Sequence, residues 1–327
     1  MSSATNASGN SAASGAAQAV SRLGFGCSEL GSTSSYRSSC RLLERAYQLG
    51  IRHFDLAPAY GDGLAERIVG DVFGAARADV EIVTKVGIGR PVTHAGRRVL
   101  RRMLLPVRRA LPGVWRAAAR GAPQAPAARG QFDPAAVRTS FSESLRLLRV
   151  DRVRSLLLHE VVSHDIRDAL LDELAGFCRT GATQSVGLAT SLEATRAILP
   201  CGSIFTWIQV PHYWGAFSEA FIPPHPGVRA THRVLRDVSS ILASREIQDA
   251  IERTDDAPGL RRLLGEPHSR SSLLLHAAVL QNATGPVLAS TSRLEHLDRL
   301  VAAAGDRTLD RPANALNACL QDAGAIR

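Results

Sequence analysis

Eight short β-strand patterns alternate along the chain with amphipathic helical patterns, and this alternation limits the possible folds more than any other feature. The predicted strands are 22–26, 51–56, 80–86, 153–159, 185–189, 205–210, 228–231 and 287–290. Eight strands separated by helices favour a closed (β/α)8 TIM barrel over an open doubly wound sheet. Gly24, Gly26 and Gly31 do not have the G-x-G-x-x-G spacing of a dinucleotide-binding sheet, which supports the barrel.

The ends of several helices are marked by specific residues. Asp133 is expected to cap a helix whose first residue is Pro134. Two earlier helices are expected to stop at Gly50 and Gly74, because glycine tolerates the left-handed conformation that often follows a helix. In each case a predicted strand follows soon afterwards, as a barrel requires.

The expected domain organisation is a single barrel with two additions. Residues 1–19 are rich in Ser, Ala and Gly and predict a disordered tail without the features of a secretion signal. Residues 20–327 form the barrel domain, and residues 88–132 form an insertion after the third strand that is too long for an ordinary loop. No apolar run reaches the roughly 18 to 20 residues of a membrane span. We expect a soluble cytoplasmic protein, monomeric or weakly associating, with no membrane partner.

The net charge of +9 is concentrated in the insertion, where residues 88–132 contain ten Arg and no Asp or Glu. Aromatic residues make up only 5% of the chain and are not interleaved with the basic ones, so no nucleic-acid partner is expected. The five cysteines are scattered and form no CxxC pair. We therefore expect free thiols and no metal site.

Lys85 is the only lysine among 39 basic residues. Arginine cannot replace an ammonium group where a compact point charge is needed, so the position suggests a functional requirement. The alternative is that one lysine remains by chance in a chain that is biased towards arginine.

Four ionisable residues are expected to meet at one end of the barrel. Asp55, Lys85 and His159 stand at the C-terminal ends of the second, third and fourth predicted strands, and Tyr60 lies in the loop after the second. Active sites of such barrels form at this end. Each residue alone has an ordinary structural explanation, such as a turn, a helix cap or a core histidine, but their joint placement predicts a proton-transfer site.

These residues lie in segments that resemble the aldo-keto reductase family. The resemblance is carried by residues 50–61 (GIRHFDLAPAYG), Glu66 and Gly70, residues 84–87 (TKVG), residues 142–145 (SESL) and Leu158-His159. It covers roughly residues 20–301 without the insertion, and it is more specific in the first segment than in the C-terminal part.

The resemblance implies an oxidoreductase that transfers a hydride between a nicotinamide cofactor and a small aldehyde, ketone or sugar, with Tyr60 as general acid or base. A free phenol has a pKa of about 10, and a neighbouring ammonium lowers it. Lys85 is assigned this role, Asp55 keeps the ammonium charged, and His159 orients and polarises the carbonyl oxygen.

The resemblance also implies a set of cofactor contacts, with NADP expected and NAD also usable. Gln209 matches a glutamine that contacts the nicotinamide carboxamide, while Thr190 stands where the family usually has Asn. His232 falls where an aromatic ring stacks on the nicotinamide, although it could equally be a surface histidine. The implied contacts are Gly26, Cys27, Ser28, Asp55, Thr190, Gln209, His232, Ser290, Thr291, Ser292, Arg293 and His296.

Residues 290–293 precede a helix and match a phosphate-binding segment, but they could instead be a plain helix cap. His296 stands where relatives have an arginine, which weakens the expected preference for NADP. Two other functions stay open at this point: a cofactor-binding barrel that regulates a partner with little turnover, and a scaffold whose basic insertion binds a polyanion.

Overall fold

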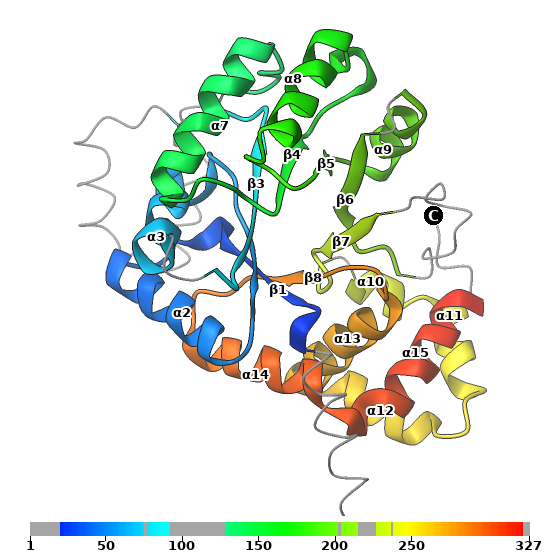
Figure 1. Ribbon diagram of the computed structural model, residues 1–327. Helices are drawn as coiled ribbons and strands as arrows, with labels where there is room; N and C mark the ends of the chain where they lie inside the picture. Colours follow the sequence, from blue (N-terminus) through cyan, green and yellow to red (C-terminus); the bar gives the residue numbers. More distant parts are fainter. Residues whose placement is uncertain are drawn as a thin grey trace, which may run out of the picture.

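The computed structural model describes residues 20–74, 78–91, 128–201, 204–214, 227–236 and 238–322. Within them, eight parallel strands close into a barrel in chain order, with β1 paired to β8 (Figure 1). The predicted (β/α)8 fold is confirmed. The strands are β1 (Leu23–Gly26), β2 (His53–Asp55), β3 (Glu81–Val86), β4 (Ser155–His159), β5 (Val186–Ala189), β6 (Phe205–Pro211), β7 (Val228–His232) and β8 (Val287–Ala289).

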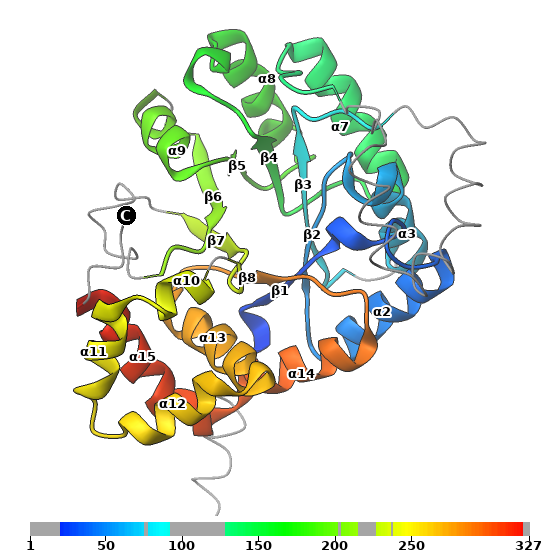
Figure 2. The same ribbon diagram turned by 180° about the vertical axis from the view of Figure 1, so that it is seen from behind.

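Helices surround the strands on the outside of the barrel, as Figures 1 and 2 show from opposite sides. The α-helices are α2 (Tyr36–Gln48), α3 (Ala65–Val72), α7 (Pro134–Leu148), α8 (Asp168–Arg179), α9 (Leu192–Ile198), α10 (Val238–Leu242), α11 (Arg245–Glu252), α12 (Ala257–Gly265), α13 (Pro267–Gln281), α14 (Leu294–Gly305) and α15 (Asp310–Asp322). Short 3-10 helices are η1 (Cys27–Glu29), η2 (Tyr60–Gly63), η4 (Ser163–Asp165), η5 (Leu199–Cys201) and η6 (Arg307–Leu309).

The predicted helix ends are present. Asp133 Oδ1 accepts the backbone N–H groups of Ala135 and Ala136 at 3.0 and 3.2 Å, and Pro134 occupies the first turn of α7. Gly50 and Gly74 follow α2 and α3 with φ of 95° and 45°. These conformations end each helix and turn the chain back towards the sheet.

Between β7 and β8 the described residues form four α-helices, α10 to α13, where a simple barrel has one. They gather with α15 on one side of the barrel (Figure 1). Helix α13 is buried continuously from Leu273 to Val279, because α12, α14 and α15 all pack against it. His276 of α13 lies in this contact, with Nδ1 2.9 Å from the Ala303 carbonyl oxygen and Nε2 2.8 Å from Asp310 Oδ1.

The two ends of the predicted insertion lie side by side above β3. Gly89 N–H donates to the Ala128 carbonyl at 2.8 Å, and Gln131 N–H donates to the Gly87 carbonyl at 3.0 Å. A Cβ on Gly87 would lie 2.3 Å from the Phe132 ring, so only glycine permits this contact. The expected tail, residues 1–19, and residues 92–127 of the insertion lie outside the described residues.

Side chains inside the barrel form layers. An apolar cluster of Val83, Leu157, Ala189, Trp207 and Ala230 fills the interior. Because side chains alternate along a strand, the residues two positions beyond Val83 and Leu157 point inward one layer higher. Those residues are Lys85 and His159. The alternation of side chains along β3 and β4 therefore places both of them inside the C-terminal mouth of the barrel.

The described residues contain no helix that is long and apolar enough to cross a membrane. Cys27, Cys40, Cys178 and Cys319 are free thiols, as expected.

Candidate active site

Lys85 is the centre of a buried polar cluster at the C-terminal mouth of the barrel. Its side chain is 1% exposed, and Nζ lies 2.5 Å from Asp55 Oδ1 and 2.8 Å from the carbonyl oxygen of Leu56. Asp55 ends β2 beside β3, which explains how the two side chains meet. The ammonium therefore has a charged partner and a backbone partner in a nearly dry environment.

Tyr60 lies next to this ammonium, and His159 lies next to Tyr60. Lys85 Nζ is 4.8 Å from the centroid of the Tyr60 ring. The Tyr60 and His159 rings have centroids 6.0 Å apart and meet edge to face at 88°. The structure thus brings together all four ionisable residues that the sequence predicts to converge.

The loop that carries Tyr60 has an unusual backbone. Gly61, Asp62 and Gly63 all have positive φ, of 62°, 57° and 82°. A Cβ on Gly61 would lie 1.8 Å from the carbonyl oxygen of Leu30, so the loop passes directly over the chain that follows β1. Only glycine fits there, and the Ala59-Tyr60-Gly61 pattern is explained by this close approach.

Burial and charge act in opposite directions on the two central groups. Burial alone would lower the pKa of Lys85, but Asp55 and Tyr60 outweigh it and raise that pKa above its ordinary value. Burial raises the pKa of Tyr60, and the lowering effect of Lys85 only partly offsets it. The expected lowering effect of the ammonium is present, but the net shift of the Tyr60 pKa is upward, because desolvation of the phenol is the larger effect.

Two histidines at the mouth are neutral at physiological pH. Burial, reinforced by Lys85 and Arg129, lowers the pKa of His159 to about 3. Burial also lowers the pKa of His232, at the end of β7, to about 4. His159 Nδ1 is buried and has no hydrogen-bond partner among the described residues. A neutral imidazole at this place can donate to, or accept from, a bound polar group without carrying charge into the site.

The residues expected to contact a cofactor fall at the same end of the barrel. Gly26 is in register with Asp55, and a Cβ on it would lie 2.3 Å from Ser290 Oγ. Cys27 is buried, and burial together with the Asp55 carboxylate raises its pKa well above the usual value, so the thiol stays protonated. Ser28 is exposed. This strand end therefore offers backbone and small side chains, and no charge of its own.

Gln209 and Thr190 differ in whether their side chains are already hydrogen-bonded within the protein. Gln209 is in register with Ala189, is 5% exposed, and its Oε1 has no hydrogen-bond partner among the described residues. The Thr190 hydroxyl instead donates to the Val161 carbonyl at 3.0 Å. A buried, unpartnered amide oxygen fits a ligand that donates a hydrogen bond, such as a carboxamide.

The segment after β8 has the geometry of a helix start. Thr291 Oγ1 accepts the Arg293 N–H at 3.2 Å, Ser290, Ser292 and Arg293 are exposed, and α14 begins at Leu294. His296 lies in the first turns of α14, and burial together with neighbouring arginines lowers its pKa. The lowered pKa makes His296 a poorer counterpart of a permanently charged arginine.

Glu66, Thr84 and Arg90, which the sequence alone did not mark as site residues, form a second polar cluster behind the first. Glu66 is 1% exposed and accepts hydrogen bonds from both other residues. The available signals were an acidic residue on the apolar face of α3 and its place in the matching segment. Among the described residues, no group of three His, Cys, Asp or Glu side chains could hold a metal ion.

Residues 22–199 match the model of the aldo/keto reductase family, which is more than half of the chain. The protein belongs to this family. A D-threo-aldose 1-dehydrogenase from Pseudomonas sp. is 28% identical over 196 residues, which are 57% of this chain and 56% of that protein. The chain thus matches only a little over half the length of that relative.

Solved structures of other aldo-keto reductases share the fold over nearly the whole chain. A glycerol dehydrogenase from Gluconobacter oxydans has a TM-score of 0.65 at 16% identity, covering 94% of this chain and 93% of its own. An aldo-keto reductase from Klebsiella pneumoniae, solved in complex with NADPH, has a TM-score of 0.57 at 17% identity, covering 89% and 90%. The barrel of this aldo-keto reductase therefore matches its relatives beyond the segment that sequence comparison detects.

Proposed function

We propose that this protein is a nicotinamide-dependent oxidoreductase that interconverts a small aldehyde, ketone or sugar and its reduced or oxidised partner, with Tyr60 as the proton donor or acceptor. The observation that carries the proposal is the Lys85 ammonium, buried between the Asp55 carboxylate and the Tyr60 ring. A bound nicotinamide would supply or accept the hydride, and the protein has to handle the proton.

Reduction requires a protonated Tyr60 that can give up its proton as negative charge develops on the carbonyl oxygen. The raised pKa keeps the phenol protonated at neutral pH. The Lys85 ammonium stabilises the phenolate that remains after transfer, and this stabilisation is strong because little water reaches the site. Neutral His159 can donate a hydrogen bond to the same oxygen and hold it near the phenol.

We assign the cofactor contacts by the fit of the residues present. Gln209 would hold the carboxamide through its unpartnered Oε1, and His232 and Thr190 would lie against the nicotinamide. Gly26, Cys27 and Ser28 would lie along the cofactor at the end of β1, next to Asp55. Ser290, Thr291, Ser292 and Arg293 would receive a phosphate at the start of α14, with His296 beside them. We propose NADP as the main cofactor, on the model of the NADPH-bound relative, with NAD also accepted.

A substrate panel tests this function. Oxidation of NADPH and NADH is followed with aldehydes and ketones, and reduction of NADP⁺ and NAD⁺ is followed with aldoses, because one relative is an aldose dehydrogenase. Turnover in one of these classes, lost in Tyr60→Phe, is expected. If both cofactors bind but no member of the panel reacts, the protein is not this enzyme, and a regulatory role of the barrel becomes the better hypothesis.

A further inference from the structure

A buried carboxylate lies just outside the barrel wall, behind the proposed site. Glu66, in the first turn of α3, is 1% exposed. Its Oε1 accepts a hydrogen bond from Thr84 Oγ1 at 2.7 Å, and its Oε2 accepts one from Arg90 Nη2 at 2.5 Å. Both carboxylate oxygens are therefore held from different parts of the chain.

Thr84 connects this carboxylate to Lys85. The two residues are adjacent in β3, and successive side chains of a strand point to opposite faces. Lys85 points into the barrel towards Asp55, so Thr84 points outward to α3, where it meets Glu66. The hydrogen bond thus fixes the strand segment that carries the ammonium.

Helix α3 connects the same carboxylate to Tyr60. The left-handed turn after Tyr60 leads directly into α3, whose first turn contains Glu66. Arg90 extends the cluster to α7, because its Nη2 also donates to Ser144 Oγ at 2.9 Å. One carboxylate therefore joins the helix that follows Tyr60, the strand of Lys85 and the neighbouring helix.

Stability alone does not explain such a cluster. A paired charge in the interior is often no more stabilising than well-packed apolar side chains of similar volume. The ion pair adds a defined geometry. Glu66 accepts one hydrogen bond at each carboxylate oxygen, from Thr84 in β3 and from Arg90 in the chain after β3. These contacts connect the strand residue next to Lys85 with the helix that follows the Tyr60 loop.

We propose that Glu66, held by Thr84 and Arg90, is a positioning residue that sets how closely the Lys85 ammonium lies to the Tyr60 phenol. This proposal rests on the proposed function, because it assigns the cluster a task in proton transfer. It has its own readout, however: the ionisation of Tyr60 in the protein without cofactor or substrate.

The first test removes one hydroxyl. Thr84→Val keeps the shape of the side chain but gives up the hydrogen bond to Glu66, and Thr84→Ser keeps that bond. Tyrosinate absorbance is titrated in each protein and in its Tyr60→Phe counterpart, and the difference reports Tyr60 alone. Thr84→Val is expected to raise the pKa of Tyr60 by about half a unit or more, because the ammonium that lowers it is less well placed.

Kinetics give a second readout of the same variants. Thr84→Val is expected to lower kcat on the order of three- to tenfold, with KM changed less than about twofold, because substrate contacts are untouched. Thr84→Ser should stay close to wild type in both measurements. The matched control is Thr195→Val in α9, where the hydroxyl is equally buried but donates to the carbonyl of Ser191, the N-cap of the same helix, at 2.8 Å.

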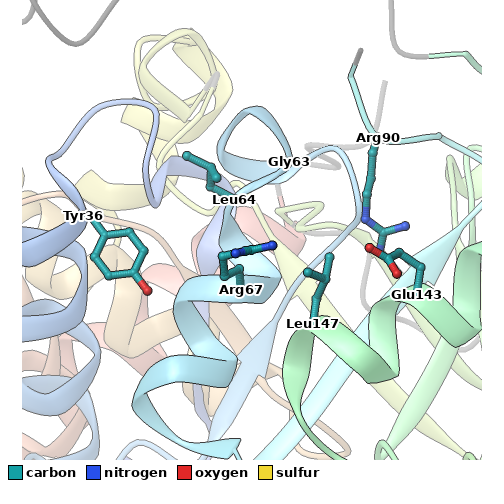
Figure 3. A pocket seen from close by; sticks show the side chains of 7 residues that line it. All are labelled: Tyr36, Gly63, Leu64, Arg67, Arg90, Glu143 and Leu147. Atoms are coloured by element: carbon teal, nitrogen blue, oxygen red, sulfur yellow. The ribbon is translucent and has the colours of Figure 1, made fainter. Parts of the chain in front are cut away.

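The second test uses the surroundings of Arg90. A cavity of about 370 Å³ between α2, α3 and α7 is lined on one side by Arg90, whose side chain lies next to Glu143 there (Figure 3). Arg90→Ala is expected to raise the pKa of Tyr60 and to lower kcat. Guanidinium added at millimolar concentration is expected to restore the pKa of Tyr60 in this variant, whereas sodium at equal ionic strength is not.

The proposal is overturned if Thr84→Val titrates and turns over like wild type, or if Thr195→Val shifts Tyr60 as much as Thr84→Val does. Absence of turnover in the wild type would contradict the proposed function only, because the Tyr60 titration would still report whether the cluster positions the ammonium.

Discussion

Replacing Lys85 with Arg or Met separates the need for a charge from the need for an ammonium. Lys85 and Asp55 have side chains 1% and 5% exposed, so neither is screened by water. Removing one partner of such a buried pair destabilises a protein by about 3–5 kcal/mol. We expect Lys85→Met to lose stability of this order and to lower turnover by about 10²-fold or more.

Lys85→Arg keeps the charge but should be nearly as damaging to turnover. The guanidinium is planar and larger than the ammonium, and Nζ now fits between two oxygens at 2.5 and 2.8 Å. A planar group cannot hold both contacts without displacing Asp55 or Leu56. Turnover is measured as kcat with the best substrate of the panel, and stability by urea unfolding of the same samples.

The double variant Asp55→Asn with Lys85→Met serves as the control. It removes the unpaired buried charge, so part of the lost stability should return while turnover stays low. If Lys85→Arg keeps more than about half of the wild-type kcat, the argument that this site needs an ammonium is wrong.

Three further predictions concern the cofactor, the loop and pH. Arg293→Ala should weaken NADPH by about 1.5–3 kcal/mol and leave NADH nearly unchanged, as measured by fluorescence titration. Gly61→Ala should displace Tyr60 and reduce turnover strongly, because its Cβ would lie 1.8 Å from a carbonyl oxygen. His212 is buried directly after β6. Burial lowers the pKa values of His159 and His212 to about 3 and that of His232 to about 4, from an ordinary 6.5. The unfolded chain therefore binds more protons below pH 6.5, and the free energy of unfolding should fall from pH 6.5 to 4 by up to about 1.4 kcal/mol per pH unit for each histidine.

Each of these has a result that would contradict it. Equal weakening of both cofactors in Arg293→Ala would show that Arg293 does not contact the 2′-phosphate. Gly181→Ala, where φ is +76° but no atom lies within 4 Å of the added Cβ, should lose only about 1–2 kcal/mol from strain. If Gly61→Ala loses no more stability and turnover than Gly181→Ala, the close approach of Gly61 to the Leu30 carbonyl is unimportant. Replacing His232 with Phe should make the free energy of unfolding depend less steeply on pH. An unchanged slope would contradict the conclusion that His232 is buried in its neutral form.

The barrel and the convergence of the candidate site residues at one end of it were predictable because they follow from local patterns. Strand period fixes which side chains point inward, and strand order fixes which ends meet, so Asp55, Lys85 and His159 could be placed together from their positions at strand ends. The uniqueness of Lys85 added a chemical reason. The helix ends at Asp133 and Gly50 depend only on nearby residues and were predicted for the same reason.

What could not be predicted depends on contacts between distant segments. Thr84 and Glu66 are ordinary residues in sequence, and only the packing of α3 on β3 makes them partners. The direction of the Tyr60 pKa shift depends on how much water surrounds the phenol, which a sequence does not state. Of the helices described between β7 and β8, α11, α12 and α13 pack on α15, and their number could not be read from strand spacing.

The most direct test of the account is single-turnover reduction by Tyr60→Phe, compared with wild type, using saturating NADPH and the best carbonyl substrate. The ring remains, so cofactor affinity should change less than about twofold, while the proton donor is gone and the rate should fall at least about 10²-fold. A reduction rate near that of wild type, with the cofactor bound equally well, would contradict the assignment of Tyr60 as the group that transfers the proton.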